Sequence, residues 1–213
     1  MNTTIKMKQV ILSVMVALPF LYLTYLWGQL PEIVPIHWNA AGKADGFGGK
    51  ISLLFIAALP LFIIGILRIA QKIDPKQNLK RIRGKMPTIE LIVTGFISAI
   101  SLYAIFSALK STSSISFLML LFGMFFMILG NYMQTIRPNY FIGIRTPWTL
   151  QNDEVWKITH RFTGRLWMLG GALIVIFSLV NVGWAASTIL LPLLLSMAFI
   201  PMLYSYWVYR KID

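Results

Sequence analysis

Few residues in this chain could carry acid–base, nucleophilic or metal chemistry. The 213 residues include two histidines, His37 and His160, seven acidic residues and no cysteine. The lack of cysteine excludes disulfides, thiolate metal sites and thiol nucleophiles. Asp153 and Glu154 are adjacent, but they follow Asn152, a pattern typical of a helix N-cap with acids in the first turn. The sequence contains no His-Glu-x-x-His pair, Gly-x-Ser-x-Gly elbow or glycine-rich phosphate loop, so it predicts no catalytic residue, cofactor or metal site.

The first of two candidate site segments is residues 31–50. Pro31 and Pro35 favour an extended chain in its first half. Residues 39–42 and the pair Asp45-Gly46 then supply turn chemistry. We expect a short ordered excursion that presents Pro35, His37, Trp38, Asn39, Gly42 and Asp45 to a ligand. A tryptophan anchor at the membrane interface beside a glycine-rich turn would explain the same residues without a ligand.

The second candidate segment is residues 131–165. It predicts a turn at 137–139, an extended run at 140–145 and a helix from Asn152 that lies along the membrane interface, with apolar residues at 3–4 spacing. A basic amphipathic helix on the membrane surface explains much of this segment. The alternative is docking of a cytoplasmic partner, and the residues assigned to it are Asn131, Arg137, Pro138, Asn139, Gly143, Arg145, Thr146, Pro147, Trp148, Trp156, Thr159 and His160.

The rest of the chain has the composition of a membrane protein. Hydrophobic residues make up 57% and charged residues 12%, whereas soluble domains hold about 45–50% and about 25%. A helix that crosses a bilayer needs about 20 mostly apolar residues. The sequence predicts an all-α integral membrane protein with six such helices, at about 10–27, 51–70, 89–109, 115–133, 166–180 and 185–208. A five-span alternative fuses the last two into one long bent helix.

The basic residues predict the orientation of these spans. Lys and Arg favour the cytoplasmic ends of short loops. Sixteen of the 19 lie in the leader, in 68–85, in 137–165 and in the tail, and the other three are Lys43, Lys50 and Lys110. Both termini are therefore expected in the cytoplasm, with His37 and His160 on opposite faces, too far apart to share a metal ion. The net charge of +12 then meets anionic lipid headgroups, which argues against nucleic-acid binding.

At the two candidate segments the sequence resembles the SdpI family of membrane immunity proteins. The run PIHWNAAGKADG (35–46) looks like the N-terminal module of that family and its relatives. The second module is indicated by GN (130–131), RPNY (137–140), GIRTPW (143–148), VW (155–156) and TH (159–160). We accordingly divide the chain into a two-span module, 1–88, and a four-span module, 89–213.

The resemblance implies a binding protein of the bacterial cytoplasmic membrane, without catalysis. Family members protect the cell from a secreted peptide toxin, the sporulation-delaying protein. They also act as receptors that draw a cytoplasmic winged-helix repressor to the membrane. The outer segment would then meet the toxin, and the inner segment would dock the repressor.

Two other functions fit the sequence less well. A small permease or exporter for a peptide or lipid would need a polar cavity at mid-membrane, whereas the predicted spans are nearly free of ionisable groups. A membrane-embedded enzyme could use His37 and Asp45, but neither candidate segment offers a nucleophile with an adjacent base.

Overall fold

The computed structural model describes residues 3–39, 43–75, 85–110, 114–180 and 188–212. Within these ranges the six predicted spans are present as long apolar helices: α1 (Thr3–Leu26), α2 (Ser52–Ile73), α4 (Met86–Lys110), α5 (Ile115–Met133), α7 (Asp153–Leu179) and α9 (Leu190–Ile212). A short helix, α6 (Pro147–Gln151), precedes α7. Two strands, β1 (Ile33–Trp38) and β2 (Ala44–Gly49), form a small hairpin between α1 and α2. The all-α membrane class with six spans is confirmed.

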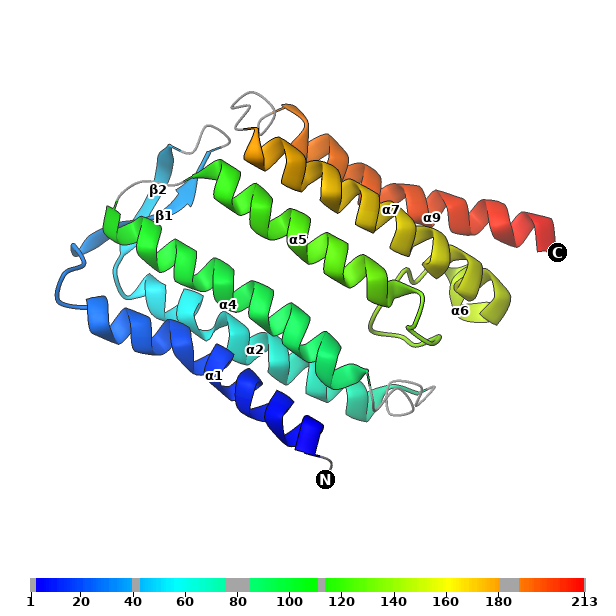
Figure 1. The fold of residues 1–213 in the computed structure, drawn as a ribbon, viewed down its shortest axis with the longest axis horizontal. Coiled ribbons are helices and arrows are strands. Elements are labelled where there is room, and N and C mark those ends of the chain that lie inside the picture. The colour runs from blue at the N-terminus through cyan, green and yellow to red at the C-terminus, as the bar shows by residue number, and fades with distance from the viewer. Residues whose placement is uncertain (1–2, 40–42, 76–84, 111–113, 181–187, 213) are drawn as a thin grey trace.

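The helices pack as two groups of three, shown side by side in Figure 1. The first group is α1, α2 and α4, the second is α5, α7 and α9, and α4 and α5 contact each other between them. The hairpin lies at the end of the bundle opposite α6 and the two termini (Figure 1). The five-span alternative is wrong, because α7 and α9 run side by side and the Trp167 Nε1–H donates to the Met197 carbonyl at 2.9 Å.

Three helices contain an internal proline, and in each the freed carbonyl is satisfied by a neighbouring helix. Proline has no N–H, so the carbonyl four residues earlier loses its helical donor. Pro19 frees the carbonyl of Met15, which accepts from Ser98 Oγ of α4 at 2.7 Å. Pro60 frees the carbonyl of Ile56, which accepts from Ser101 Oγ at 2.8 Å. Pro201 frees the carbonyl of Met197, the acceptor of the Trp167 bond described above.

The tightest helix contact is between α5 and α7, and it runs through glycine. Gly123 and Gly130 on α5 face Gly171 and Gly164 on α7. A methyl carbon built on Gly123 would lie 2.8 Å from the Gly171 carbonyl oxygen, and one on Gly130 would lie 2.8 Å from that of Gly164. The seven-residue spacing on both helices brings the two backbones together at two successive levels, as small residues do in membrane helix pairs.

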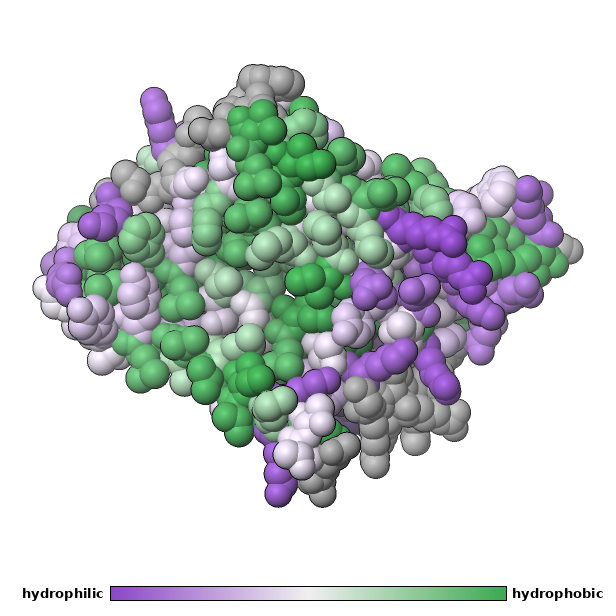
Figure 2. Space-filling view, viewed as in Figure 1, coloured by the Kyte–Doolittle hydropathy of each residue, from purple (hydrophilic) through white to green (hydrophobic). Residues whose placement is uncertain are grey.

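The surface carries the apolar belt that six spans require. Figure 2 shows hydrophobic side chains over the middle of the visible face and hydrophilic ones gathered toward the end with the termini. Large apolar side chains such as Phe55, Leu169 and Leu203 are 69–72% exposed, which a lipid surround accounts for.

The boundary between the two modules, 1–88 and 89–213, stays a prediction. It falls at the start of α4, and this helix packs more extensively on α1 and α2 than on α5.

Candidate functional site

The first candidate segment forms the β1–β2 hairpin, and this hairpin is docked on the ends of the first helix group. Pro35 pairs with Phe47 and His37 pairs with Gly46 across the antiparallel strands. Val34 is fully buried in a cluster with Leu26, Leu30 and residues of α2 and α4. The extended chain expected at Pro31 and Pro35 is confirmed. The turn expected at Asp45-Gly46 is wrong, because both residues lie in β2, and Gly42 lies outside the described residues.

Two polar pairs cross this hairpin. His37 Nδ1 and Asp45 Oδ1 are 2.5 Å apart, on side chains that are 71% and 44% exposed. Nearer the helices, Lys50 Nζ bonds Glu32 Oε1 at 2.6 Å and lies 5.2 Å from the ring centre of Trp27. The carboxylate of Asp45 orients the imidazole, and its Nε2 has no hydrogen-bond partner among the described residues. The arrangement can bind a polar or charged ligand through hydrogen bonds.

Trp38 and Asn39 lie at the tip side of the hairpin. The Trp38 indole Nε1 is buried and has no hydrogen-bond partner among the described residues. Asn39 is tied to the returning strand, because its Oδ1 accepts from the Lys43 N–H at 3.1 Å and its N–H donates to the Lys43 carbonyl at 2.9 Å. The structure therefore places His37, Trp38, Asn39 and Asp45 on one small hairpin.

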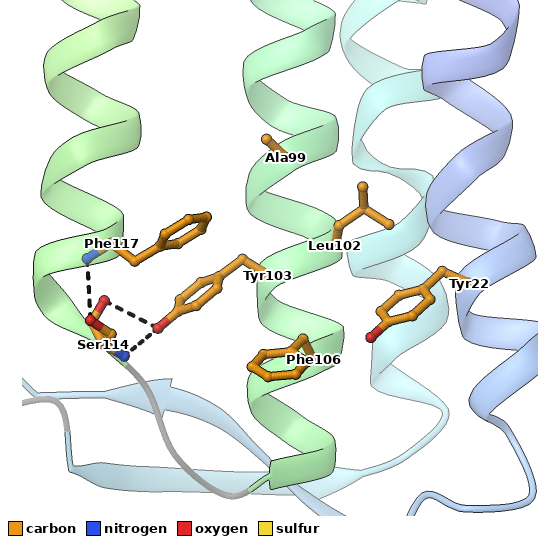
Figure 3. A pocket seen from close by; sticks show the side chains of 7 residues that line it. All are labelled: Tyr22, Ala99, Leu102, Tyr103, Phe106, Ser114 and Phe117. Carbon is orange, nitrogen blue, oxygen red and sulfur yellow. Dashed lines mark hydrogen bonds between the residues drawn. The ribbon is translucent and has the colours of Figure 1, made fainter.

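An apolar groove of about 780 Å³ opens between α1, α4 and α5, close to the hairpin (Figure 3). Its lining is Tyr22, Ala99, Leu102, Tyr103, Phe106, Ser114 and Phe117. The Tyr103 hydroxyl accepts from the Ser114 N–H and donates to the Ser114 carbonyl at 3.1 Å, which fixes the start of α5 against α4. Ser114 Oγ then caps α5 by accepting from the Phe117 N–H at 3.3 Å. None of these groove residues belongs to either candidate segment.

The second candidate segment folds into a compact loop closed by buried polar side chains. Asn139 is fully buried, and its Oδ1 accepts from the N–H groups of Phe141 and Ile142 while its Nδ2 donates to the carbonyls of Arg137 and Ile142. One asparagine side chain thus closes a turn over residues 137–142. The extended run expected at 140–145 is wrong, because its first residues belong to this turn.

His160 closes the same loop from α7. Its Nε2 accepts from the Ile144 N–H at 3.1 Å, so Nδ1 carries the proton and donates to the Trp156 carbonyl at 2.8 Å. The ring stacks on Trp156 at 3.9 Å, and the Trp156 Nε1–H donates to the Ile136 carbonyl at 2.8 Å. Gly143 packs against this imidazole with φ of 112°, a left-handed conformation that favours glycine.

A cluster of hydroxyls connects the loop to α9. Thr146 and Thr149 form a capping box on α6. Thr146 Oγ1 also lies 3.0 Å from Ser205 Oγ, and the Trp148 Nε1–H donates to Ser205 Oγ at 2.5 Å. Sequence reasoning missed Ser205 and Thr149. A serine among the aromatic residues near the end of an apolar span and a threonine three residues after Thr146 are the signals that could have indicated them.

The residues assigned to partner docking therefore separate by burial. Asn139, Thr146, Trp156, Thr159 and His160 are buried, whereas Asn131, Arg137, Arg145 and Pro147 are exposed, and Pro138, Gly143 and Trp148 are half-buried. Arg145 also braces the loop, because its Nη1 donates to the Tyr140 carbonyl at 2.8 Å.

The separate interfacial helix expected from Asn152 is wrong. Asn152 caps α7 as predicted, with its Oδ1 accepting from the N–H groups of Glu154 and Val155. The helix then continues without a break to Leu179, and its apolar side packs on the inner loop and α5 rather than lying on the membrane surface.

Six bundled apolar helices, with a two-stranded hairpin at one end and a closed loop at the other, define a multi-pass membrane protein. Residues 135–205 match the SdpI/YfhL protein family, and residues 14–64 match a domain of unknown function, DUF1648. The chain is 30% identical over 207 residues to the immunity protein SdpI of Bacillus subtilis, which covers 97% of this chain and 98% of that protein. It is also 38% identical over 58 residues to an uncharacterized protein of Archaeoglobus fulgidus, 27% of this chain and 32% of that one. No solved structure matches.

The chain belongs to the SdpI family. It is accordingly a multi-pass protein of the bacterial cytoplasmic membrane.

Proposed function

We propose that this protein is an immunity protein that protects the membrane of its cell from a secreted, membrane-active peptide toxin. The observation that carries the proposal is the match over 97% of the chain to a protein named for immunity. The matched length includes both the hairpin and the inner loop, which hold the site residues discussed above. The proposed activity is binding, with no reaction assigned to the protein.

The hairpin and the neighbouring groove offer a two-part site for such a peptide. The exposed His37–Asp45 pair suits a polar or charged portion of the peptide. The aromatic groove beside Tyr103 and Phe106 suits an apolar portion that arrives through the bilayer. A membrane-active peptide must present both kinds of surface, since it moves from water into lipid.

Docking of a cytoplasmic winged-helix repressor is the second part of the proposal. We assign it to the exposed face of the inner loop, at Arg137, Arg145 and Pro147. The buried residues of that loop, His160 among them, would hold this face in shape without touching the partner. Repressor docking then lies within the module 89–213, whereas the toxin site combines the hairpin of the module 1–88 with a groove lined mainly by α4.

The test is retention of membrane potential in sensitive cells that express the protein and are challenged with the sporulation-delaying toxin. We expect the wild type to keep the potential, and His37→Ala and Trp38→Ala to fall to the level of cells without the protein. Arg145→Ala should still protect but fail to recruit the repressor to membranes. The matched control is Glu32→Gln, which removes the other hairpin carboxylate.

Membrane insertion is measured for every variant, so that loss of protein is not mistaken for loss of binding. Protection by Glu32→Gln at the wild-type level is expected. If all hairpin variants protect fully while Arg145→Ala does not, the outer site is wrong. An inserted wild type that gives no protection contradicts the immunity proposal for this toxin.

A further inference from the structure

A row of three cations marks one side of α7 where it leaves the apolar belt. Lys157, Arg161 and Arg165 are spaced four residues apart, so they are neighbours along the helix surface. All three are exposed, and none of their side chains forms an ion pair or hydrogen bond within the part of the chain that the structure describes. Three unpaired cations side by side repel one another unless an anion lies among them.

These cations border a groove of about 590 Å³ between α7 and α9. Its aromatic wall is Phe162 stacked on Tyr204, with ring centres 4.1 Å apart, and Tyr204 in turn lies 5.6 Å from Trp207. Tyrosine and tryptophan gather at the level of lipid headgroups, where one end of the side chain is apolar and the other is wet. The groove therefore lies at the boundary between headgroups and hydrocarbon.

The sequence around Arg165 also indicates that the groove lies at the edge of the hydrocarbon layer. After Arg165, residues 166–180 contain no charged side chain. The next residues on the same ridge of α7, Leu169 and Leu173, are 69% and 47% exposed. An amphiphile seated here would have its charge beside the arginines and an acyl chain along these leucines.

Asp153 and Glu154 line the far end of the groove, in the first turn of α7. Their carboxylates disfavour an anion beside Lys157 and leave Arg161 and Arg165 as the pair for a phosphate. Guanidinium groups one turn apart can donate together to the oxygens of one phosphate.

We propose that this groove binds an anionic phospholipid, with its phosphate on Arg161 and Arg165 and its acyl chain toward Leu169. The site does not depend on the proposed immunity function. It does not depend on the orientation of the chain either, because headgroups border both faces of a bilayer.

The test is native mass spectrometry of the purified, delipidated protein titrated with phosphatidylglycerol, phosphatidylethanolamine and phosphatidylcholine. We expect the first bound lipid on the wild type to be phosphatidylglycerol. In the double variant Arg161→Gln/Arg165→Gln this first binding step should weaken about tenfold or more, because two charge-assisted contacts are lost. The matched control is Lys6→Gln/Lys72→Gln, which removes two exposed cations from the same end of the bundle. It should bind like the wild type.

Three outcomes would overturn the proposal. The first is a wild type without preference for phosphatidylglycerol, a result that needs no variant to fold. The second is a double variant that binds as tightly as the wild type. The third is an equal loss in the control pair, which would indicate diffuse attraction by net charge.

Discussion

The conformation of the inner loop depends on a few side chains that are buried and so are not visible on the surface. His160 is 1% exposed and bonds two backbone groups with its two ring nitrogens, one as acceptor and one as donor. Only the neutral ring with its proton on Nδ1 fits this pattern. We therefore expect this residue to affect partner docking only through the shape of the loop.

Gly143→Ala should unfold this loop locally. The glycine has φ of 112°, and a methyl carbon there would lie 2.3 Å from His160 Nε2. Backbone strain of this kind costs about 1–3 kcal/mol, and displacement of the imidazole adds to it. Thermal unfolding in detergent should show a lower midpoint for this variant.

Gly28→Ala is the control, because a methyl carbon at Gly28 has nothing within 4 Å. Its midpoint should stay near that of the wild type. Equal midpoints for the two variants would show that Gly143 and His160 do not hold the loop.

At the residue scale, sequence alone predicted which segments are ordered better than it predicted which of their side chains are buried. The pairing of His37 with Asp45 was within reach, since both residues were assigned to one ordered outer segment. Burial of His160 and Thr159 could not be predicted, because the apolar residues of their helix have a spacing that fits a membrane surface as well as a protein core. Whether lipid or protein covers this helix depends on residues far away in the sequence, such as Ile144 and Ile136. A local sequence pattern does not predict these contacts.

At the scale of elements, glycine determines how closely α5 approaches α7. Gly130→Leu should separate these helices, because even a methyl carbon there would lie 2.8 Å from a carbonyl of α7. Overpacking costs about 1–3 kcal/mol, and a rigid backbone neighbour puts this site at the upper end. The measurement is the fraction of folded protein after heating in detergent.

Gly65→Leu provides the comparison on α2, where a methyl carbon meets nothing within 4 Å. The Gly65 variant should behave like the wild type. A Gly130 variant that is as stable as the Gly65 variant would rule out close backbone contact between α5 and α7.

The bond from Ser101 to Ile56 should matter only while residue 60 is proline. Ser101→Ala should cost about 1 kcal/mol, as interhelical hydrogen bonds in membranes do. In a Pro60→Ala background the same change should cost close to nothing, since the new N–H at residue 60 bonds the Ile56 carbonyl. A double-mutant cycle on unfolding free energies measures this coupling.

Ser107→Ala serves as the reference on the same helix, because the buried Ser107 hydroxyl has no partner among the described residues. Its removal should leave stability unchanged or slightly raised. Identical losses for Ser101→Ala with and without Pro60 would contradict the assignment. Sequence analysis could locate these prolines, but it could not predict that α4 supplies the donors, because that requires the packing of α1 and α2 on one helix.

For the whole molecule, the orientation in the membrane is open to a direct measurement. The chain has no cysteine, so single cysteines can be introduced without background. Lys43→Cys, on the hairpin side, should react with an impermeant maleimide in intact cells, and Lys157→Cys should react only after the cells are broken. The opposite pattern would place the termini outside.

The number of spans could be predicted because each apolar run must be long enough to cross the hydrocarbon layer, whatever the other runs do. Span 115–133 agrees with α5 residue for residue. The start of α7 was misplaced by 13 residues, from 166 to Asp153, because the charged turns before the membrane continue the same helix. The packing of the helices in two groups of three could not be predicted, since it depends on contacts between residues far apart in the chain.

The proline carbonyls also bear on how the protein is made. Translation delivers α1 and α2 to the bilayer first, and the donors for both of their freed carbonyls are on α4. Until α4 is synthesised, these two helices carry polar groups in hydrocarbon that only a third helix can satisfy. For α9 the order is reversed, because Trp167 of α7 is already in place when Pro201 enters. The helices α1, α2 and α4 therefore satisfy one another's polar groups only when all three are in the membrane. The last helix, α9, meets its hydrogen-bond donor on α7 as soon as it inserts.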